Sequence, residues 1–295
     1  LEVTPGVAAR AGDATGGGQI YMVRGGELEN HVIQLDGADM GSFRQNRADR
    51  LLTLNTDAIG DVQVKTAAVD ASVPLGSGAV INVSLKSGSN QLRGSAFYYN
   101  RDSSLASTSW RSNLIGAPKD TLEWHQFGGT AGGPILRDKF FFFGSYEGFR
   151  QSFSDTFLTT VPTLAQRQGV FNADVIDPAT GQPFPNRTIP QSRWDPLGRK
   201  LLELFPQPNL AGRAASGGRV IENYGAQRPG REDTHKFDVR TDWIPSTSDR
   251  VFARASFLQQ DIFRDAIFEG LGDGVGNQGE QCNRNLALGT SWTRI

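Results

Sequence analysis

The residue types that most often carry catalysis or bind metals are few in this chain and widely spaced. His31, His125 and His235 lie far apart, and none has the spacing of a zinc-binding HExxH helix. There is no CxxC pair, no GxSxG nucleophile motif and no Walker A motif. The GSG at 76–78 lacks a third glycine at the dinucleotide-binding spacing and precedes a predicted strand instead of a helix. We therefore predict a protein that is not an enzyme and that uses no metal or cofactor.

Composition and charge exclude some classes of protein and leave others open. The net charge is −1, so no strong positive field attracts nucleic acid. No run of 18 apolar residues occurs, which excludes a membrane-spanning helix. The strands of a transmembrane β-barrel alternate apolar and polar residues and give a much weaker signal, so composition does not exclude such a barrel.

The start of the chain and its single cysteine give two further expectations. The N-terminal segment lacks the basic start and the apolar stretch of a signal peptide. We therefore expect either an intracellular protein or a chain from which a leader has been removed. Cys282 is the only cysteine and has no partner for a disulfide within the chain. An unpaired thiol in a loop is the simpler interpretation, and a bridge to a partner protein is the alternative.

The first 92 residues have the pattern of short strands separated by glycine turns. Strands are predicted in QIYMVRGG (19–26), HVIQLDGADM (31–40), IGDVQVKT (59–66) and GAVINVSLKSGSN (78–90). Each is an apolar run with polar ends or a clean alternation of apolar and polar residues. Residues 1–92 are therefore predicted to form a small domain, mixed α/β or mostly β.

From residue 93 the predicted strands are longer, and their connections alternate between two sizes. The strands are predicted at 93–100, 122–135, 140–153, 235–244, 250–260 and 285–295. Tight turns follow the second and fourth strands, whereas a structured connection at about 154–233 separates the third from the fourth. Outer-membrane β-barrels combine tight periplasmic turns with long outer loops in this way. We therefore predict that 93–295 form about six antiparallel strands of a transmembrane β-barrel.

The long connection contains one clear helix signal. In WDPLGRKLLELFPQPN (194–209), Asp195 is a predicted N-cap and Pro196 occupies the first helical position. Pro206 ends the predicted helix. A structured loop of this length usually has a function.

The segment KFFFFGSYEGFR (139–150) is the most apolar stretch of the predicted barrel. Its four phenylalanines follow the charged turn at 137–139 directly, which is where a barrel strand enters the membrane. Aromatic residues collect at this level as a girdle. The predicted girdle consists of Phe140, Phe141, Phe142, Phe143 and Trp243. Which pair of phenylalanines faces lipid stays open, because one pair can pack inward against whatever fills the barrel.

Charged residues alternate with apolar ones along the strand at 235–244. Phe237, Val239, Thr241 and Trp243 share one face, and the charged residues between them share the other. A soluble sheet with one face in water gives the same alternation. In a barrel, the charged side faces a wet lumen and the apolar side faces lipid. The predicted lumen-facing residues are Glu147, Asp238, Arg240, Asp242 and Arg254.

These segments together resemble the TonB-dependent outer-membrane receptors. The plug domain and first barrel strand of that family are similar to VRGG, VIQLDGADM, DAIGDVQVKT and GSGAVINVSLKSGSNQLRGSAFYYNR. The Oar-like subgroup is similar to HQFGGTAGGPILRDKFFFFGSYEGFRQ, TVPTLAQRQGVF, DPATGQPFPNRTIP, DPLGRKLLELFPQPN, KFDVRTDW and DRVFARASF. The similarity covers nearly the whole chain in the expected order. The combination is specific, although no single motif is.

The resemblance implies a fold, a location and a set of partners. The family has a plug inside a 22-stranded barrel in the outer membrane of Gram-negative bacteria. This chain then corresponds to a fragment with part of the plug and the first strands. The implied activity is ligand transport driven by the TonB–ExbB–ExbD complex. Arg24, Gly25, Asp36 and Gly37 match the plug motifs. Arg24 and Asp36 form an internal ion pair on one interpretation, and are unpaired charges at hairpin ends on the other.

Two other functions remain open from the sequence. One is a surface or adhesion protein that uses the barrel only as an anchor for its loops. The other is a soluble, secreted β-protein that binds carbohydrate. The transported ligand and the residues that bind it are not predicted.

Overall fold

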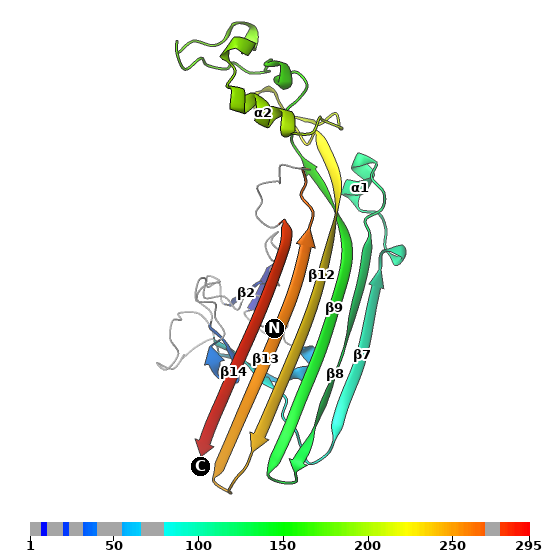
Figure 1. Ribbon diagram of the computed structural model, residues 1–295, viewed down its shortest axis with the longest axis vertical. Helices are drawn as coiled ribbons and strands as arrows, with labels where there is room; N and C mark the ends of the chain where they lie inside the picture. Colours follow the sequence, from blue (N-terminus) through cyan, green and yellow to red (C-terminus); the bar gives the residue numbers. More distant parts are fainter. Residues whose placement is uncertain (1–6, 11–19, 24–31, 40–54, 66–79, 269–277) are drawn as a thin grey trace.

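The computed structural model describes residues 7–10, 20–23, 32–39, 55–65, 80–268 and 278–295. Its main feature is a curved antiparallel sheet of six strands, which run side by side in Figure 1 in the order β14-β13-β12-β9-β8-β7. The strands are β7 (Arg93–Asp102), β8 (Leu122–Leu136), β9 (Phe140–Thr159), β12 (Tyr224–Trp243), β13 (Asp249–Arg264) and β14 (Gly279–Arg294). Within the described residues the sheet is open, with β7 and β14 at its edges.

The connections between these strands separate by length onto the two ends of the sheet. The turns that join β8 to β9 and β12 to β13 are short and lie at the lower end in Figure 1. The long connections 160–223 and 103–121 lie at the upper end. This arrangement agrees with the alternation of short and long connections predicted from the sequence.

The two central strands are longer than their apolar pattern predicts. β9 and β12 have 20 residues each and pair without interruption from Phe140↔Trp243 to Thr159↔Tyr224. The predicted connection at 154–233 is therefore too long, and the strands leave only 160–223 between them. A tilted barrel strand crosses the hydrocarbon with about 9–11 residues. Beyond that level neither face of the strand has to be apolar, so backbone pairing continues without an apolar alternation to reveal it.

The N-terminal part forms a second, smaller sheet with the order β4-β3-β6-β5. Its strands are β3 (Val32–Leu35), β4 (Ala38–Asp39), β5 (Ile59–Lys65) and β6 (Val80–Leu85), and β3 and β6 are parallel. A separate antiparallel pair joins β1 (Val7–Arg10) to β2 (Ile20–Val23). Leu35, Ala58 and Leu85 of this part are buried in one cluster with Phe143 of β9. The small sheet and the six-stranded sheet, which we call the wall, therefore share a core.

The long connection 160–223 is largely ordered by its own hydrogen bonds. Its helix α2 (Pro196–Leu204) has the predicted Asp195 N-cap, whose carboxylate accepts a hydrogen bond from the Gly198 N–H at 2.8 Å. The short strands β10 (Arg213–Ala215) and β11 (Arg219–Ile221) pair with each other. In the described part of the chain, no helix has the length and apolar character needed to cross a membrane.

The connection between β7 and β8 is tied to the wall by Asp120. It carries helix α1 (Trp110–Ile115), which is capped by Ser109. One Asp120 carboxylate oxygen accepts hydrogen bonds from Thr156 Oγ1 at 2.6 Å, Ser112 Oγ at 2.8 Å and Gln227 Nε2 at 3.0 Å. Partial burial disfavours the charged form, but hydrogen bonds from Ser109, Thr156, Ser112 and Gln227 outweigh it and lower the Asp120 pKa to about 2.

This depressed pKa predicts a defined pH dependence of stability. The contribution of ionised Asp120 is present above the ordinary aspartate pKa of 3.8 and is lost as pH falls toward about 2. Asp120→Asn should lower the thermal midpoint of the detergent-solubilised protein at pH 5, and the difference from the unsubstituted protein should shrink as pH approaches 2. A difference that is constant across this range would contradict the prediction.

Candidate functional site

The outward side of the large sheet carries a continuous apolar belt. In one row across four strands, Tyr146 pairs with Phe237, Phe237 with Phe257, and Phe257 with Leu286. The next row toward the turns contains Val239 and Leu288. Phe237 is 46% exposed, Val239 52% and Leu288 69%. A contiguous apolar surface of this kind is unfavourable in water and marks contact with lipid or with another protein.

Aromatic residues mark both margins of this belt. At the turn end, one row contains Phe140, Trp243 and Trp292. At the other end, the Tyr146 hydroxyl lies 2.9 Å from His235 Nδ1, and the Tyr98 hydroxyl lies 2.7 Å from His125 Nδ1. Tyrosine is suited to such a margin, because its ring is apolar and its hydroxyl is polar. The structure therefore has a second aromatic margin, with tyrosines in two adjacent rows, which the sequence analysis missed.

The run of four phenylalanines is divided between the two sides of the wall. Phe140 and Phe142 lie on the outward side, which also carries Trp243. Phe143 is only 5% exposed and packs inward against Leu35 and Leu85. Because side chains alternate along a strand, Phe141 lies on the same inward side. The prediction of four girdle phenylalanines is therefore wrong for Phe143, which packs against the small sheet, and for Phe141, which shares its inward side.

The inward side of the wall carries the predicted charged residues. Lys236 Nζ donates to Glu147 Oε1 at 2.7 Å, and the Glu147 side chain is 3% exposed. Ser145 Oγ donates to Asp238 Oδ2 at 3.0 Å. Farther toward the turns, the Arg240 guanidinium donates to both oxygens of Asp242 at 2.9–3.1 Å. Glu147 and Asp242 are thus in ion pairs, and Asp238 is held by a hydroxyl group, on the face of the wall that meets the small sheet.

Four charged groups join the small sheet to the wall. We call them the ionic junction, and they are Asp36 of the small sheet and Arg240, Asp242 and Arg254 of the wall. Asp36 lies in the β3–β4 turn, in a left-handed conformation at φ 49°, followed by Gly37 at φ 81°. This turn aims the Asp36 carboxylate at the wall. Arg240 Nη1 donates to Asp36 Oδ1 at 2.8 Å, and Arg254 Nε lies 3.3 Å from Asp36 Oδ2.

Backbone carbonyls of the small sheet complete the junction. Arg254 Nη2 donates to the Leu35 carbonyl at 3.0 Å, and Arg240 Nη1 also donates to the Leu85 carbonyl at 3.2 Å. The Arg240 guanidinium lies over the Phe252 ring, 4.6 Å from its centroid. Arg254 therefore binds the end of β3, and Arg240 binds the end of β6.

The junction is deeply buried but incompletely hydrogen-bonded. The side chains of Asp36 and Arg254 are 4% and 1% exposed. The 3.3 Å contact between them is an ion pair by distance without hydrogen-bond geometry, so Arg254 Nε and Nη1 have no acceptor among the described residues. Removing one partner from a buried ion pair is strongly destabilising, although the intact pair adds little net stability. The junction therefore specifies where the small sheet docks more than it strengthens the docking.

The other predicted site residues have different outcomes. Arg24 and Gly25 lie outside the described residues. Asp36 pairs with arginines of β12 and β13, and Arg240 is 204 positions away, a separation that carries no local sequence signal. Cys282 is an exposed free thiol in β14, not in a loop. Within the described ranges, no group of three or more His, Cys, Asp or Glu side chains is placed to hold a metal ion.

Comparison with known proteins identifies the wall. A family model described as an outer membrane beta barrel domain matches residues 84–295, which is most of the chain. The chain belongs to the outer-membrane β-barrel family. This membership explains the apolar belt as the lipid-facing side of the barrel and supports an outer-membrane location. No curated protein sequence matches the chain.

Solved structures share the barrel fold at low sequence identity. The outer membrane transporter YddB from Escherichia coli is 11% identical with a TM-score of 0.51, covering 100% of this chain and 34% of that one. A mutant of the ferric enterobactin receptor PfeA from Pseudomonas aeruginosa is 13% identical with a TM-score of 0.50, covering 97% and 34%. The chain thus spans about a third of the length of these structures, and the likeness establishes the fold alone.

Removing the charge of Asp36 should separate the small sheet from the barrel wall. Asp36→Asn leaves Arg240 and Arg254 buried without their shared counter-charge, and the expected cost is about 3–5 kcal/mol. Urea unfolding of the protein in detergent micelles, followed by tryptophan fluorescence, measures this loss.

Asp61→Asn is the matched control. Asp61 is exposed on β5 of the same small sheet, and among the described residues its carboxylate accepts a side-chain hydrogen bond from Gln63 alone. The unfolding free energy of Asp61→Asn should therefore differ from that of the unsubstituted protein by less than about 0.5 kcal/mol. Equal midpoints for the two variants would show that the ionic junction does not hold the sheet in place.

Proposed function

We propose that this chain is part of a TonB-dependent outer-membrane receptor of the Oar-like subgroup, which moves a ligand across the outer membrane. The observation that carries the proposal is the docking of a separate small sheet on the inward side of a barrel wall. That sheet contacts the wall through the ionic junction and the cluster around Phe143. A blocked lumen requires a mechanism that opens it, and this distinguishes an energised receptor from an open pore.

The sequence resemblance and the fold point in the same direction. The motifs that resemble the plug of TonB-dependent receptors include Asp36 and Gly37, which form the turn that reaches the wall. The structural neighbours of comparable fold are described as an outer membrane transporter and a ferric enterobactin receptor. On this proposal the small sheet is the plug, and the strands from Arg93 onward are part of a larger multi-pass barrel.

The proposed partners are the outer-membrane lipids and the TonB–ExbB–ExbD complex. Force applied to the plug would act against a junction whose ion pairs bring no large net stability. Once Asp36 leaves the two arginines, water can solvate all three charges, which lowers the cost of separation. The chemical nature of the transported ligand is not part of this proposal.

The apolar belt gives a direct test of membrane insertion. Leu288→Arg places a charge in the middle of the belt, which should cost about 2–4 kcal/mol of stability in lipid bilayers. Folding into vesicles at increasing urea concentration measures this cost. Leu105→Arg, in the loop before β8 and 92% exposed, is the control and should leave folding unchanged. If the protein were instead a soluble carbohydrate-binding sheet, Leu288→Arg would increase its solubility in detergent-free buffer.

Movement of the plug separates a receptor from a barrel that only anchors surface loops. Leu85 is 3% exposed at the contact between the plug and the wall, so a cysteine there should be protected from a maleimide reagent. The experiment uses Leu85→Cys with Cys282→Ser, because Cys282 is exposed. Whole cells in native growth medium, which supplies the ligand, should show several-fold more labelling when energised than after addition of a protonophore.

The alternative function predicts a different result in the same cells. If the barrel only anchors its loops, labelling of Leu85→Cys stays low with or without the protonophore. Leu105→Cys in the Cys282→Ser background should be labelled fully in both conditions, which controls for access of the reagent.

A further inference from the structure

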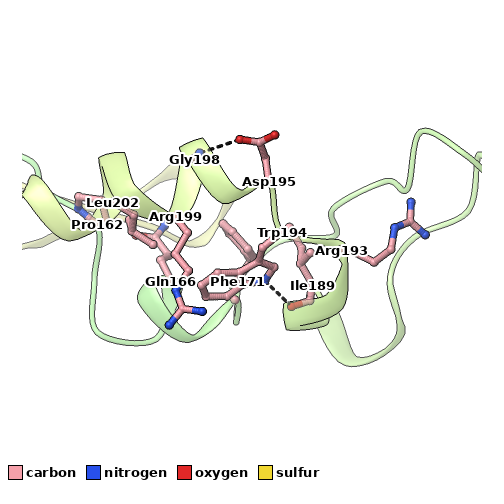
Figure 2. Close-up of a pocket in the computed structure, with 11 residues that line it drawn as sticks. Pro162, Gln166, Phe171, Ile189, Arg193, Trp194, Asp195, Gly198, Arg199 and Leu202 are labelled. Carbon is pink, nitrogen blue, oxygen red and sulfur yellow. Dashed lines mark hydrogen bonds between the residues drawn. The ribbon is translucent and has the colours of Figure 1, made fainter.

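The connection 160–223, at the upper end of the molecule in Figure 1, carries an open pocket of about 490 Å³. Phe171, Ile189, Trp194, Gly198, Arg199 and Leu202 line much of it. Figure 2 shows Trp194 and Phe171 together in the centre of the view, below the first turn of α2. This volume lies within the range of small-molecule sites, which are mostly apolar with a few placed polar groups.

Arg167 joins two walls of the pocket. Its guanidinium donates to the Pro162 carbonyl at 3.3 Å on one side. On the other side it donates to the carbonyls at the end of α2, those of Leu202 at 3.1 Å, Phe205 at 2.8 Å and Pro206 at 2.5 Å. One side chain therefore fixes the spacing of the two walls, and the pocket exists before any ligand binds.

The indole of Trp194 is a rigid wall of the same pocket. Its Nε1–H donates to the Ile189 carbonyl at 3.0 Å, which fixes the plane of the ring. Gly169 behind it has φ +84°, and a Cβ at that position would lie 3.0 Å from the ring and 2.6 Å from the Ile189 carbonyl oxygen. The absence of a side chain at Gly169 thus lets one side of the indole rest on the backbone.

Most polar groups around the pocket are occupied by the protein itself. Both terminal nitrogens of Arg193 donate to Asp177, and in Figure 2 Arg193 extends away from the other side chains. Gln166 Oε1 accepts the Thr163 N–H at 2.8 Å. Arg199 differs, because only its Nε is engaged, 3.3 Å from the exposed Glu203. Its two terminal nitrogens have no hydrogen-bond partner among the described residues.

We propose that this pocket binds a small aromatic carboxylic acid. The flat apolar ring packs against Trp194 and Phe171, and the carboxylate accepts a pair of hydrogen bonds from the terminal nitrogens of Arg199. A sugar fits less well, because the apolar lining leaves most of its hydroxyl groups without partners and desolvated. The inference goes beyond the proposed transport function and does not depend on it, since binding is a property of this connection alone.

The test uses 2-naphthoate as the probe and the full chain in detergent micelles. Quenching of tryptophan fluorescence and titration calorimetry should both report saturable binding. The expected dissociation constant is below about 1 mM. Binding of 2-naphthalenemethanol, which has the same ring without the charge, should be about tenfold weaker. Arg199→Gln should weaken 2-naphthoate by about tenfold and leave 2-naphthalenemethanol nearly unchanged.

Two leucine substitutions in the same helix form a matched pair. Gly198→Leu places a side chain in the pocket at a position where a Cβ would contact only Asp195 atoms, at 3.6 Å and 3.7 Å, so α2 should still fold. It should reduce 2-naphthoate binding by at least about tenfold, because the site is filled. Lys200→Leu introduces the same residue outside the pocket lining and should bind 2-naphthoate like the unsubstituted protein.

Three results would overturn the inference. They are an absence of saturable 2-naphthoate binding, equal binding by the Gly198→Leu and Lys200→Leu variants, and displacement of 2-naphthoate by methyl glucoside at a similar concentration. If the protein inserts into membranes and moves its plug but gives any of these results, the proposed function stands and the proposal that the pocket binds an aromatic acid fails.

Discussion

Unbroken backbone pairing between neighbouring strands is the constraint on which this structure depends. In hydrocarbon there is no water to satisfy an N–H or C=O group, so a spanning strand must pair along its whole length. The long uninterrupted registers of β9 with β12 and of β12 with β13 meet this requirement. Once the register is fixed, each side chain is assigned to lipid or to the interior by its parity. The apolar belt and the ionic junction are therefore two results of one register.

The contact between the small sheet and the wall combines two kinds of interaction with different consequences. The cluster around Phe143 gains stability from removing apolar surface from water, and this gain is not directional. The ionic junction is directional, because Asp36 must meet Arg240 and Arg254 in one orientation. Apolar burial thus supplies most of the affinity between the two parts, and the charges select one docked arrangement. On the proposed function, this division suits a plug that moves away from the wall and returns to the same position.

The sequence predicted those features that depend on local pattern. The alternation around Asp238 and Arg240 located the inward side of β12, and Asp195 with Pro196 located the start of α2. The last six residues of β9 and the first eleven of β12 were missed, because no regular apolar alternation marks them as strand. The role of Phe143 and the partners of Asp36 were also missed, since both depend on contacts between distant segments. Tyr98 and Tyr146 carry a usable signal, because polar or charged residues follow each within two positions, Asn100 and Glu147.

The length of β9 and β12 beyond the apolar belt sets the distance between the belt and the connection 160–223. A crossing of about 9–11 residues that begins at Phe140 ends near Arg150, and the roughly nine remaining residues of β9 extend about 30 Å at about 3.3 Å per residue. Even when tilted, this stalk holds α2 and its surroundings well above the lipid headgroups. On the proposed function, a solute that approaches from outside the cell meets this raised connection before it reaches the barrel lumen.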